Sequence, residues 1–183
     1  GDHRDLHSFP TRRSSDLEDK QIFDENGTLK INDNNFTDSN IKSFFKYLDG
    51  DWFEEYICKL LKNSFSYEIT TNIHIKKEHW GKNEFEIDAL IIIGYQLFGI
   101  SITTSKNVGL CKSKGFEIMH RTKQLGGDES KQVLVTCLNR ENVDKLILDF
   151  EYDTGNTQKI LVLGIDDLYE DAFIMKIKQF MEV

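Results

Sequence analysis

Two consecutive apolar segments separated by a Gly-Tyr pair constrain the fold of this chain more than any other feature. Residues 84–93 and 96–104 are rich in Ile, Leu, Phe and Thr, which favour the pleated, half-buried surface of a β-sheet. Gly94-Tyr95 between them supplies a turn residue, so the two segments predict an antiparallel hairpin. The alternation of Ile and Thr in residues 67–76 predicts one more strand ahead of this hairpin.

Helices and further strands are predicted before and after these three strands. Apolar residues at helical spacing alternate with short apolar runs along the chain, and this order of elements predicts an α/β sandwich. Thr37 or Ser39 can cap the first helix, and Gly50 is placed to end it. The predicted helices cover residues 41–48, 52–62, 112–125, 142–149 and 167–182, and the additional strands cover residues 132–137 and 160–165.

The composition along the chain indicates three parts. Residues 1–17 contain the single proline and show neither helical nor strand periodicity, so we expect a non-native or disordered leader there. Residues 18–49 hold a hairpin predicted around Asn26-Gly27 and the first helix, which lead into the core. Residues 50–183 are the predicted folded domain.

The overall composition excludes several classes of protein. With 183 residues, 39% of them apolar, the chain can bury one sizeable core, but no apolar run reaches the roughly eighteen residues of a membrane span. Three cysteines without CxxC spacing argue against a disulfide framework and a zinc site, and they favour the cytoplasm. The formal net charge of −8 disfavours nucleic-acid binding over the whole surface, so any such contact must be local.

Two carboxylates are predicted to lie together on the first strand of the hairpin. Side chains alternate between the faces of a strand, so Glu86 and Asp88 share one face and the odd-numbered residues 85–89 share the opposite, apolar face. The same alternation puts Ser101 and Thr103 together on the second strand. The hairpin then brings these two hydroxyls near Asp88.

A third carboxylate, Glu54, lies near the start of the helix 52–62. Carboxylates that converge from a helix and a strand suit Mg²⁺ or Mn²⁺, which prefer oxygen ligands and keep bound waters. One such water can be activated to attack a phosphorus atom, so the pattern favours hydrolysis of a phosphodiester. The alternative is that Glu86 and Asp88 only solvate the exposed face of an antiparallel strand.

Three short motifs resemble the PD-(D/E)xK restriction-endonuclease-like domains. They are GDWFEEYI at residues 50–57, NEFEIDAL at residues 83–90 and FGISIT at residues 98–103. More narrowly, the motifs are similar to the nuclease domain of CRISPR-associated ancillary effectors that carry a CARF sensor for cyclic oligoadenylate. The resemblance implies an α/β, restriction-endonuclease-like fold with a central mixed β-sheet flanked by helices.

The resemblance also implies roles for individual residues. In that family a helix Glu, a strand Asp and a following Glu-x-Lys hold the metal and position the water, and the lysine stabilises charge on the attacked phosphate. Glu54 and Asp88 match the first two positions, with Glu86 as a further candidate metal ligand. The third motif departs from the family, because Ser101-Ile102-Thr103 stands in its place and a threonine cannot supply a cationic donor. Either another cation substitutes or the hydrolytic site is impaired; the candidate cations are Lys106, Lys112 and Lys114.

The helix 112–125 carries two further candidates for contact with a substrate. Arg121 and Gln124 lie three residues apart on one helical face and can line a phosphate groove, although ordinary exposed helix residues show the same spacing. Two functions therefore compete. The first is a metal-dependent nuclease of DNA or RNA, the effector domain of a CRISPR-associated defence protein, for which the resemblance implies a homodimer and a sensor domain missing from this chain. The second is a catalytically impaired module for nucleic-acid binding or dimerisation.

Overall fold

The computed structural model describes most of the chain as two separate units. The first unit ends at Lys46, and its described part is the helix α2 (Asp38–Lys46). The second unit begins at Tyr47 and holds all other helices and strands described below. The described residues are 38–76, 84–155 and 158–182. The leader 1–17, the hairpin predicted around Asn26-Gly27 and Thr37 lie outside them.

The start of the second unit differs from the sequence prediction. Gly50 does not end a helix; it lies inside a π-helical turn, η1 (Tyr47–Asp51), that continues directly into α3 (Trp52–Ser64). The hydroxyl of Thr104 donates a hydrogen bond of 2.8 Å to the carbonyl oxygen of Asp49, so a residue distant in sequence holds this turn. Ser39 lies within α2 and therefore is not its cap.

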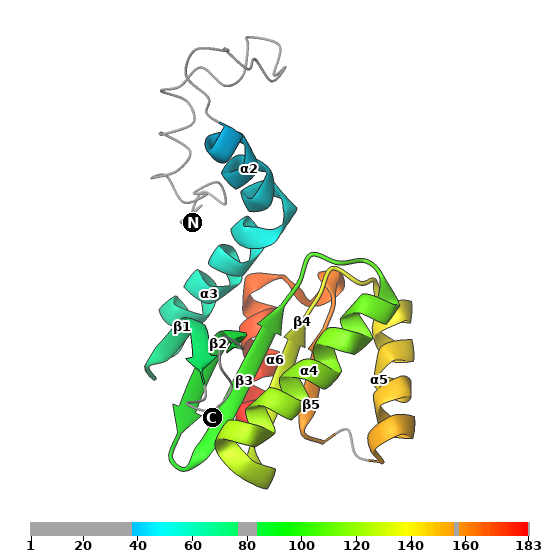
Figure 1. The fold of residues 1–183 in the computed structure, drawn as a ribbon. Coiled ribbons are helices and arrows are strands. Elements are labelled where there is room, and N and C mark those ends of the chain that lie inside the picture. The colour runs from blue at the N-terminus through cyan, green and yellow to red at the C-terminus, as the bar shows by residue number, and fades with distance from the viewer. Residues whose placement is uncertain (1–37, 77–83, 156–157, 183) are drawn as a thin grey trace, which may run out of the picture. The chain divides into compact units, whose positions relative to one another are not determined.

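A five-stranded mixed sheet forms the centre of the second unit (Figure 1). The strands follow each other in space in the order of the sequence. The first three pair antiparallel and the last three pair parallel, which confirms the predicted mixed sheet. The strands are β1 (Ile69–Lys76), β2 (Glu84–Ile93), β3 (Gln96–Ile102), β4 (Lys131–Val135) and β5 (Ile160–Leu163).

Helices cover both faces of this sheet. Apolar residues of α3 and α6 (Glu170–Met181) pack with one face in the largest core cluster, and residues of α4 (Val108–Gly126) and α5 (Arg140–Thr154) pack with the other face. Two short 3₁₀ turns, η2 (Gly127–Glu129) and η3 (Ile165–Asp167), follow α4 and β5. The α/β fold with a mixed sheet flanked by helices is thus the one predicted from the sequence. None of the described helices has the length and apolar character needed to cross a membrane.

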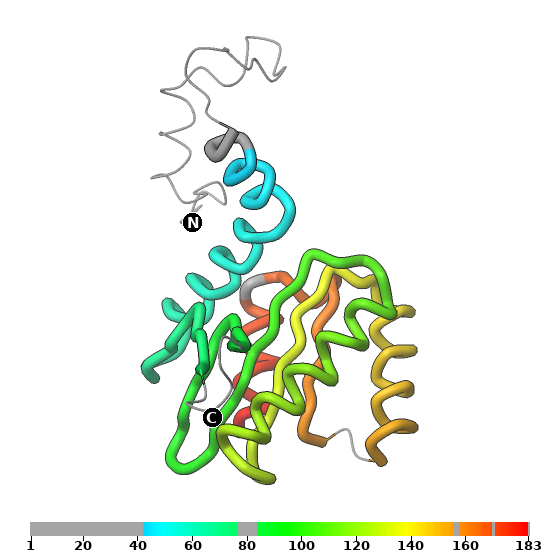
Figure 2. Tube along the Cα trace, in the orientation of Figure 1, coloured from blue at the N-terminus to red at the C-terminus, as the bar shows by residue number. Residues whose placement is uncertain are grey.

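Helix α4 begins earlier than predicted and packs unusually close to the sheet. Its N-cap is Asn107, whose side chain accepts a hydrogen bond of 3.0 Å from the backbone N–H of Leu110. Figure 2 follows the chain from β3 through residues 103–107 into α4, which runs back across the sheet. A Cβ atom at Gly99 of β3 would lie 2.2 Å from Thr122 Oγ1 on α4, so glycine is what permits this close approach.

The alternation of side chains along β2 changes phase next to Asp88. Phe85 and Ile87 pack with Ile118 of α4, whereas Ala89 belongs to the cluster on the α3 and α6 side. The expectation that residues 85, 87 and 89 share one face is therefore wrong. In the neighbouring strand Asn72 has a left-handed backbone with φ +54°, and it lies between the pairs that β1 and β2 form on either side of Asp88. This local distortion of the pairing between β1 and β2 turns β2 at Asp88.

Candidate active site

Strands β2 and β3 separate at Asp88, and the Asp88 carboxylate occupies the gap. The backbone pairing of the two strands runs from Ile93 with Gln96 to Ala89 with Ile100. Beyond that pair, the N–H of Ile102 donates to Asp88 Oδ2 at 2.6 Å and the hydroxyl of Ser101 donates to the same oxygen at 3.3 Å. The side chain thus takes the place of a backbone partner, which fixes its position at the fork of the two strands.

The second oxygen of Asp88 is left for another partner. Both hydrogen bonds go to Oδ2, so Oδ1 accepts none from the described residues. Burial raises the pKa of Asp88 above its ordinary value, although the Ile102 N–H and the Lys114 ammonium favour the ionised form. A half-buried carboxylate with one open oxygen favours a cationic ligand.

Helix α3 brings Glu54 to the same place. Cys58, one helical turn after Glu54, donates from Sγ to the backbone carbonyl of Asp88 at 3.9 Å, so this face of the helix lies against β2. Burial, together with the negative charge of Asp88, raises the pKa of Glu54 to about 7, and Lys114 opposes the shift. The Glu54 carboxylate forms no hydrogen bond or ion pair with the described residues. Two carboxylates from different elements therefore repel each other here without a full countercharge.

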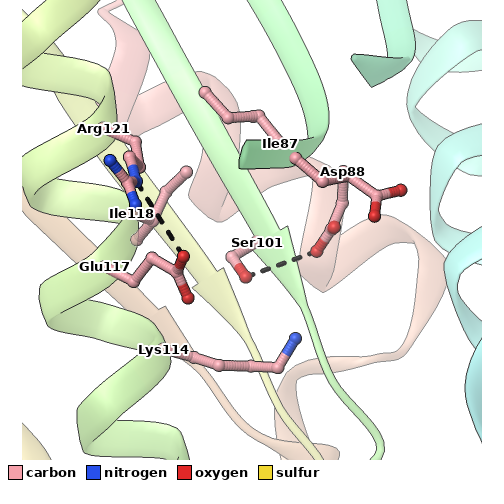
Figure 3. A pocket seen from close by; sticks show the side chains of 8 residues that line it. Ile87, Asp88, Ser101, Lys114, Glu117, Ile118 and Arg121 are labelled. Atoms are coloured by element: carbon pink, nitrogen blue, oxygen red, sulfur yellow. Dashed lines mark hydrogen bonds and ion pairs between the residues drawn. The ribbon is translucent and has the colours of Figure 1, made fainter. Parts of the chain in front are cut away.

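Helix α4 provides the cation of the site. Lys114 acts electrostatically on both Glu54 and Asp88, yet its ammonium forms no ion pair or hydrogen bond with the described residues. Figure 3 shows this side chain extending from α4 toward the Asp88–Ser101 pair. The pocket in front of it has a volume of about 200 Å³. Its lining consists of Glu86, Ile87, Asp88, Ser101, Lys114, Glu117, Ile118 and Arg121.

Other predicted site residues have partners away from the Asp88 carboxylate. Lys112 Nζ lies 2.8 Å from Asp153 and 3.5 Å from Asp149, both on α5. Thr103 Oγ1 accepts a hydrogen bond from the N–H of Ser105, and Gln124 Nε2 lies 2.9 Å from His120 Nε2. Glu86 lines the pocket but also lies 3.7 Å from His74 of β1. Lys106 is exposed in the loop before α4 and does not line the pocket.

Two pocket features were not predicted from the sequence. Glu117 lines the pocket, with its Oε1 lying 3.9 Å from Arg121 Nε. The guanidinium of Arg121 in turn lies over the ring of Phe85, 4.5 Å from its centroid. The spacing of four residues in the sequence could have indicated the contact between Glu117 and Arg121. Helix spacing alone, however, does not say which pairs face a pocket.

The donor set limits what kind of metal site this can be. Across residues 38–76, 84–155 and 158–182, no three His, Cys, Asp or Glu side chains are arranged to hold a metal ion. Of the charged groups that act on Glu54, Asp88 has the largest effect on its pKa. Ser101, at the position where the resembling family has a Glu, contributes a hydroxyl that already donates to Asp88.

Comparisons with known proteins identify the fold but no family. The sequence matches no known protein family and no curated protein. Among solved structures, the chain is similar to protein VC1899 from Vibrio cholerae, with 19% identity and a TM-score of 0.57 over 91% of this chain and 41% of that chain. It is also similar to Can2 from Sulfobacillus thermosulfidooxidans, solved in complex with cyclic tetra-adenylate, with 16% identity and a TM-score of 0.58 over 98% of this chain and 48% of that chain. The chain therefore spans less than half the length of either solved chain.

Proposed function

We propose that this chain is a metal-dependent nuclease domain of the PD-(D/E)xK type that hydrolyses phosphodiester bonds in DNA or RNA. The observation that supports the proposal is that Asp88 of β2 and Lys114 of α4 line one polar pocket, and that Glu54 of α3 lies close enough for both charges to shift its pKa. Two carboxylates stand beside a lysine that has no ion-pair partner within the described part of the chain. This arrangement matches the needs of phosphate chemistry, in which cations must neutralise both substrate and transition state.

The donor set fits Mg²⁺ or Mn²⁺. Mg²⁺ is commonly held in proteins by one or two carboxylates, while waters and substrate phosphates complete its coordination. Asp88 Oδ1 and the Glu54 carboxylate are the groups that would hold the ion, and the mutual repulsion of the two carboxylates favours its binding. A bound divalent ion lowers the pKa of a coordinated water and polarises the phosphate.

The protein's own side chains then divide the remaining tasks. Lys114 supplies the ammonium that Thr103 cannot, and it neutralises the negative charge that develops on the attacked phosphate. The Ser101 hydroxyl and the Ile102 N–H keep the Asp88 carboxylate in one orientation. Lys114 thus acts from α4, the helix that follows β3. In the family that the sequence resembles, the lysine stands at the position that Thr103 occupies here.

The proposal extends to the assembly in which the domain works. The chain spans less than half of each of the two solved chains, and Can2 was solved with cyclic tetra-adenylate. We therefore propose that the full protein is a CRISPR-associated effector, a homodimer with a sensor domain outside this chain. The test is whether cyclic tetra-adenylate changes the cleavage rate of the full-length protein, with light scattering to give its mass in solution.

A cleavage assay with matched lysine variants tests the site itself. Plasmid DNA and single-stranded RNA are incubated with protein and Mn²⁺ or Mg²⁺, with an EDTA control. Asp88→Asn and Lys114→Met are expected to abolish cleavage, whereas Lys123→Met, the same change on an exposed part of α4, is expected to retain it. Cleavage that survives Lys114→Met but is lost in Lys112→Met would overturn the assignment of the cation.

A second candidate function is a nucleic-acid-binding or dimerisation module without catalysis. It is favoured by Ser101 at the position of a family Glu and by the lack, among the described residues, of three side chains arranged for a metal. Tight binding of nucleic acid with no cleavage under any divalent ion would support this function and refute the nuclease.

A further inference from the structure

Arg121 lines the pocket, and one of its hydrogen-bond donors has no partner among the described residues. Its guanidinium carbon Cζ lies 4.5 Å from the ring centroid of Phe85, a cation–π contact that restrains the group. Nε is buried and has no hydrogen-bond partner in the described part of the chain. A guanidinium that is restrained by an aromatic ring and has an unused donor is suited to bind an oxyanion.

The carboxylate beside Arg121 is a weak and replaceable partner. The distance of 3.9 Å between Glu117 Oε1 and Arg121 Nε exceeds the range of a hydrogen bond. The side chain of Glu117 is 58% exposed and that of Arg121 is 26% exposed, so Glu117 can swing into solvent while the arginine stays. Ion pairs of this kind between residues i and i+4 contribute little free energy. A phosphate can therefore displace Glu117 at small cost.

Arg121 and Lys114 lie at different positions along the pocket. They are seven residues apart on α4, which is about two helical turns or ~10 Å along the axis. Lys114 acts on Asp88 and Glu54, whereas Arg121 is paired with Glu117 and Phe85. In Figure 3 the two side chains project from different turns of α4, with the Lys114 ammonium nearer to Asp88. A phosphate held by Arg121 is therefore a different one from the phosphate at Asp88.

We propose that Arg121 binds the backbone phosphate neighbouring the scissile one and that Glu117 occupies this subsite until a nucleic acid displaces it. This inference rests on the proposed function, because it assumes that a nucleic-acid strand enters the pocket. The substrate contact is to the phosphate backbone, and phosphate contacts position a strand without reading its sequence. Glu117 acts as an internal competitor that weakens binding to any strand.

A double-mutant cycle measured as binding in EDTA tests the inference separately from cleavage. Fluorescein-labelled oligo-dT and oligo-rU of equal length are titrated with wild type, Arg121→Lys, Arg121→Met, Glu117→Gln and the double variant Glu117→Gln/Arg121→Met. Arg121→Met is expected to weaken binding about tenfold and to lower the slope of log K against log salt by about 1. Arg121→Lys keeps the charge but loses the planar guanidinium, so its affinity is expected to lie between those of wild type and Arg121→Met.

Glu117→Gln is the decisive variant, because an exposed glutamate can be changed without unfolding the protein. It is expected to tighten binding about two- to fivefold in the presence of Arg121 and to have no effect in the Arg121→Met background. The exposed Glu151→Gln on α5 is the matched control for loss of one negative charge and is expected to change binding less. An equal gain with and without Arg121, or no gain at all, overturns the inference.

The two proposals fail in different experiments. A protein that shows the expected cycle in EDTA but cleaves nothing with Mg²⁺ or Mn²⁺ refutes the nuclease and keeps the Arg121 subsite. A protein that cleaves in a Lys114-dependent manner but shows an additive cycle keeps the nuclease and refutes the subsite. Thermal unfolding of each variant shows whether a loss of binding comes from a loss of fold.

Discussion

Glu54 is a carboxyl group whose ionisation opposes folding, and this makes its removal a sharp test of the site. Burial and the charge of Asp88 raise the pKa of Glu54 to about 7, compared with 4.5 for the same group in the unfolded chain. Between these two pH values the native state binds more protons than the unfolded state. The free energy of unfolding therefore falls as the pH rises from 4.5 to about 7, and it changes no further from this cause above that range. Glu54→Gln, which has the same shape without the charge, removes this loss.

The size of the effect follows from the pKa difference. A shift from 4.5 to about 7 corresponds to at most ~3 kcal/mol, because each pKa unit corresponds to about 1.36 kcal/mol. Glu54 is partly exposed, and solvent screening reduces the expected effect to about 1 kcal/mol. At about pH 8 the Glu54→Gln protein is therefore expected to be ~1 kcal/mol more stable than wild type, whereas at about pH 4 the two are expected to be equal.

Urea unfolding followed by tryptophan fluorescence in EDTA measures this difference across the pH range. Glu55→Gln, on the same turn of α3 but exposed, is the matched control and is expected to show no gain that grows with pH. The reasoning is refuted if Glu54→Gln is no more stable than wild type at high pH, or if the control gains as much. Either result would mean that Glu54 and Asp88 do not share one electrostatic environment.

Three substitutions test how the sheet and α4 are packed. Gly99→Ala is expected to lower the free energy of unfolding by about 1–3 kcal/mol, because its Cβ would lie 2.2 Å from Thr122 Oγ1; an unchanged urea midpoint would contradict the close packing of α4. Thr122→Val is expected to raise the free energy of unfolding by about 1 kcal/mol, since the hydroxyl is buried and unpaired among the described residues. A lower melting temperature would refute this expectation. Asp167→Ala is expected to lower the free energy of unfolding, measured with urea, by about 2–3 kcal/mol, because the buried carboxylate accepts a hydrogen bond from the Gly164 N–H and pairs with Lys176. Asp171→Ala, on the exposed start of α6, serves as its control.

Local patterns were sufficient to predict the elements that build the sheet. The predicted strand 84–93 is the observed β2, and the turn at Gly94-Tyr95 lies where the sequence placed it, with Gly94 at φ +60°. Period-two alternation and a glycine turn are properties of a few neighbouring residues, so they can be recognised in one sequence. The observed α4 begins four residues before the predicted helix, because Asn107 caps it ahead of the apolar pattern.

Contacts between distant residues decided the features that the sequence left open. The left-handed Asn72 of β1 and the separation of β2 from β3 turn the strand at Asp88, so residues 85 and 87 do not share a face with residue 89. The hydroxyl of Thr104 likewise keeps the chain helical through Gly50. Neither partner is near in sequence, which is why alternation and helix-stop rules failed at these two points.

The sequence by itself determined the order of helices and strands and the presence of Asp88 and Glu54 at places where a strand and a helix can meet. The tertiary structure decided which lysine lies beside these two carboxylates. Lys112 and Lys114 are two residues apart on one helix and therefore point roughly 200° away from each other around its axis. Because Gly115 and Ile118 of α4 are buried, the helix turns Lys114 toward the pocket and Lys112 toward Asp153 of α5, and only packing fixes that rotation.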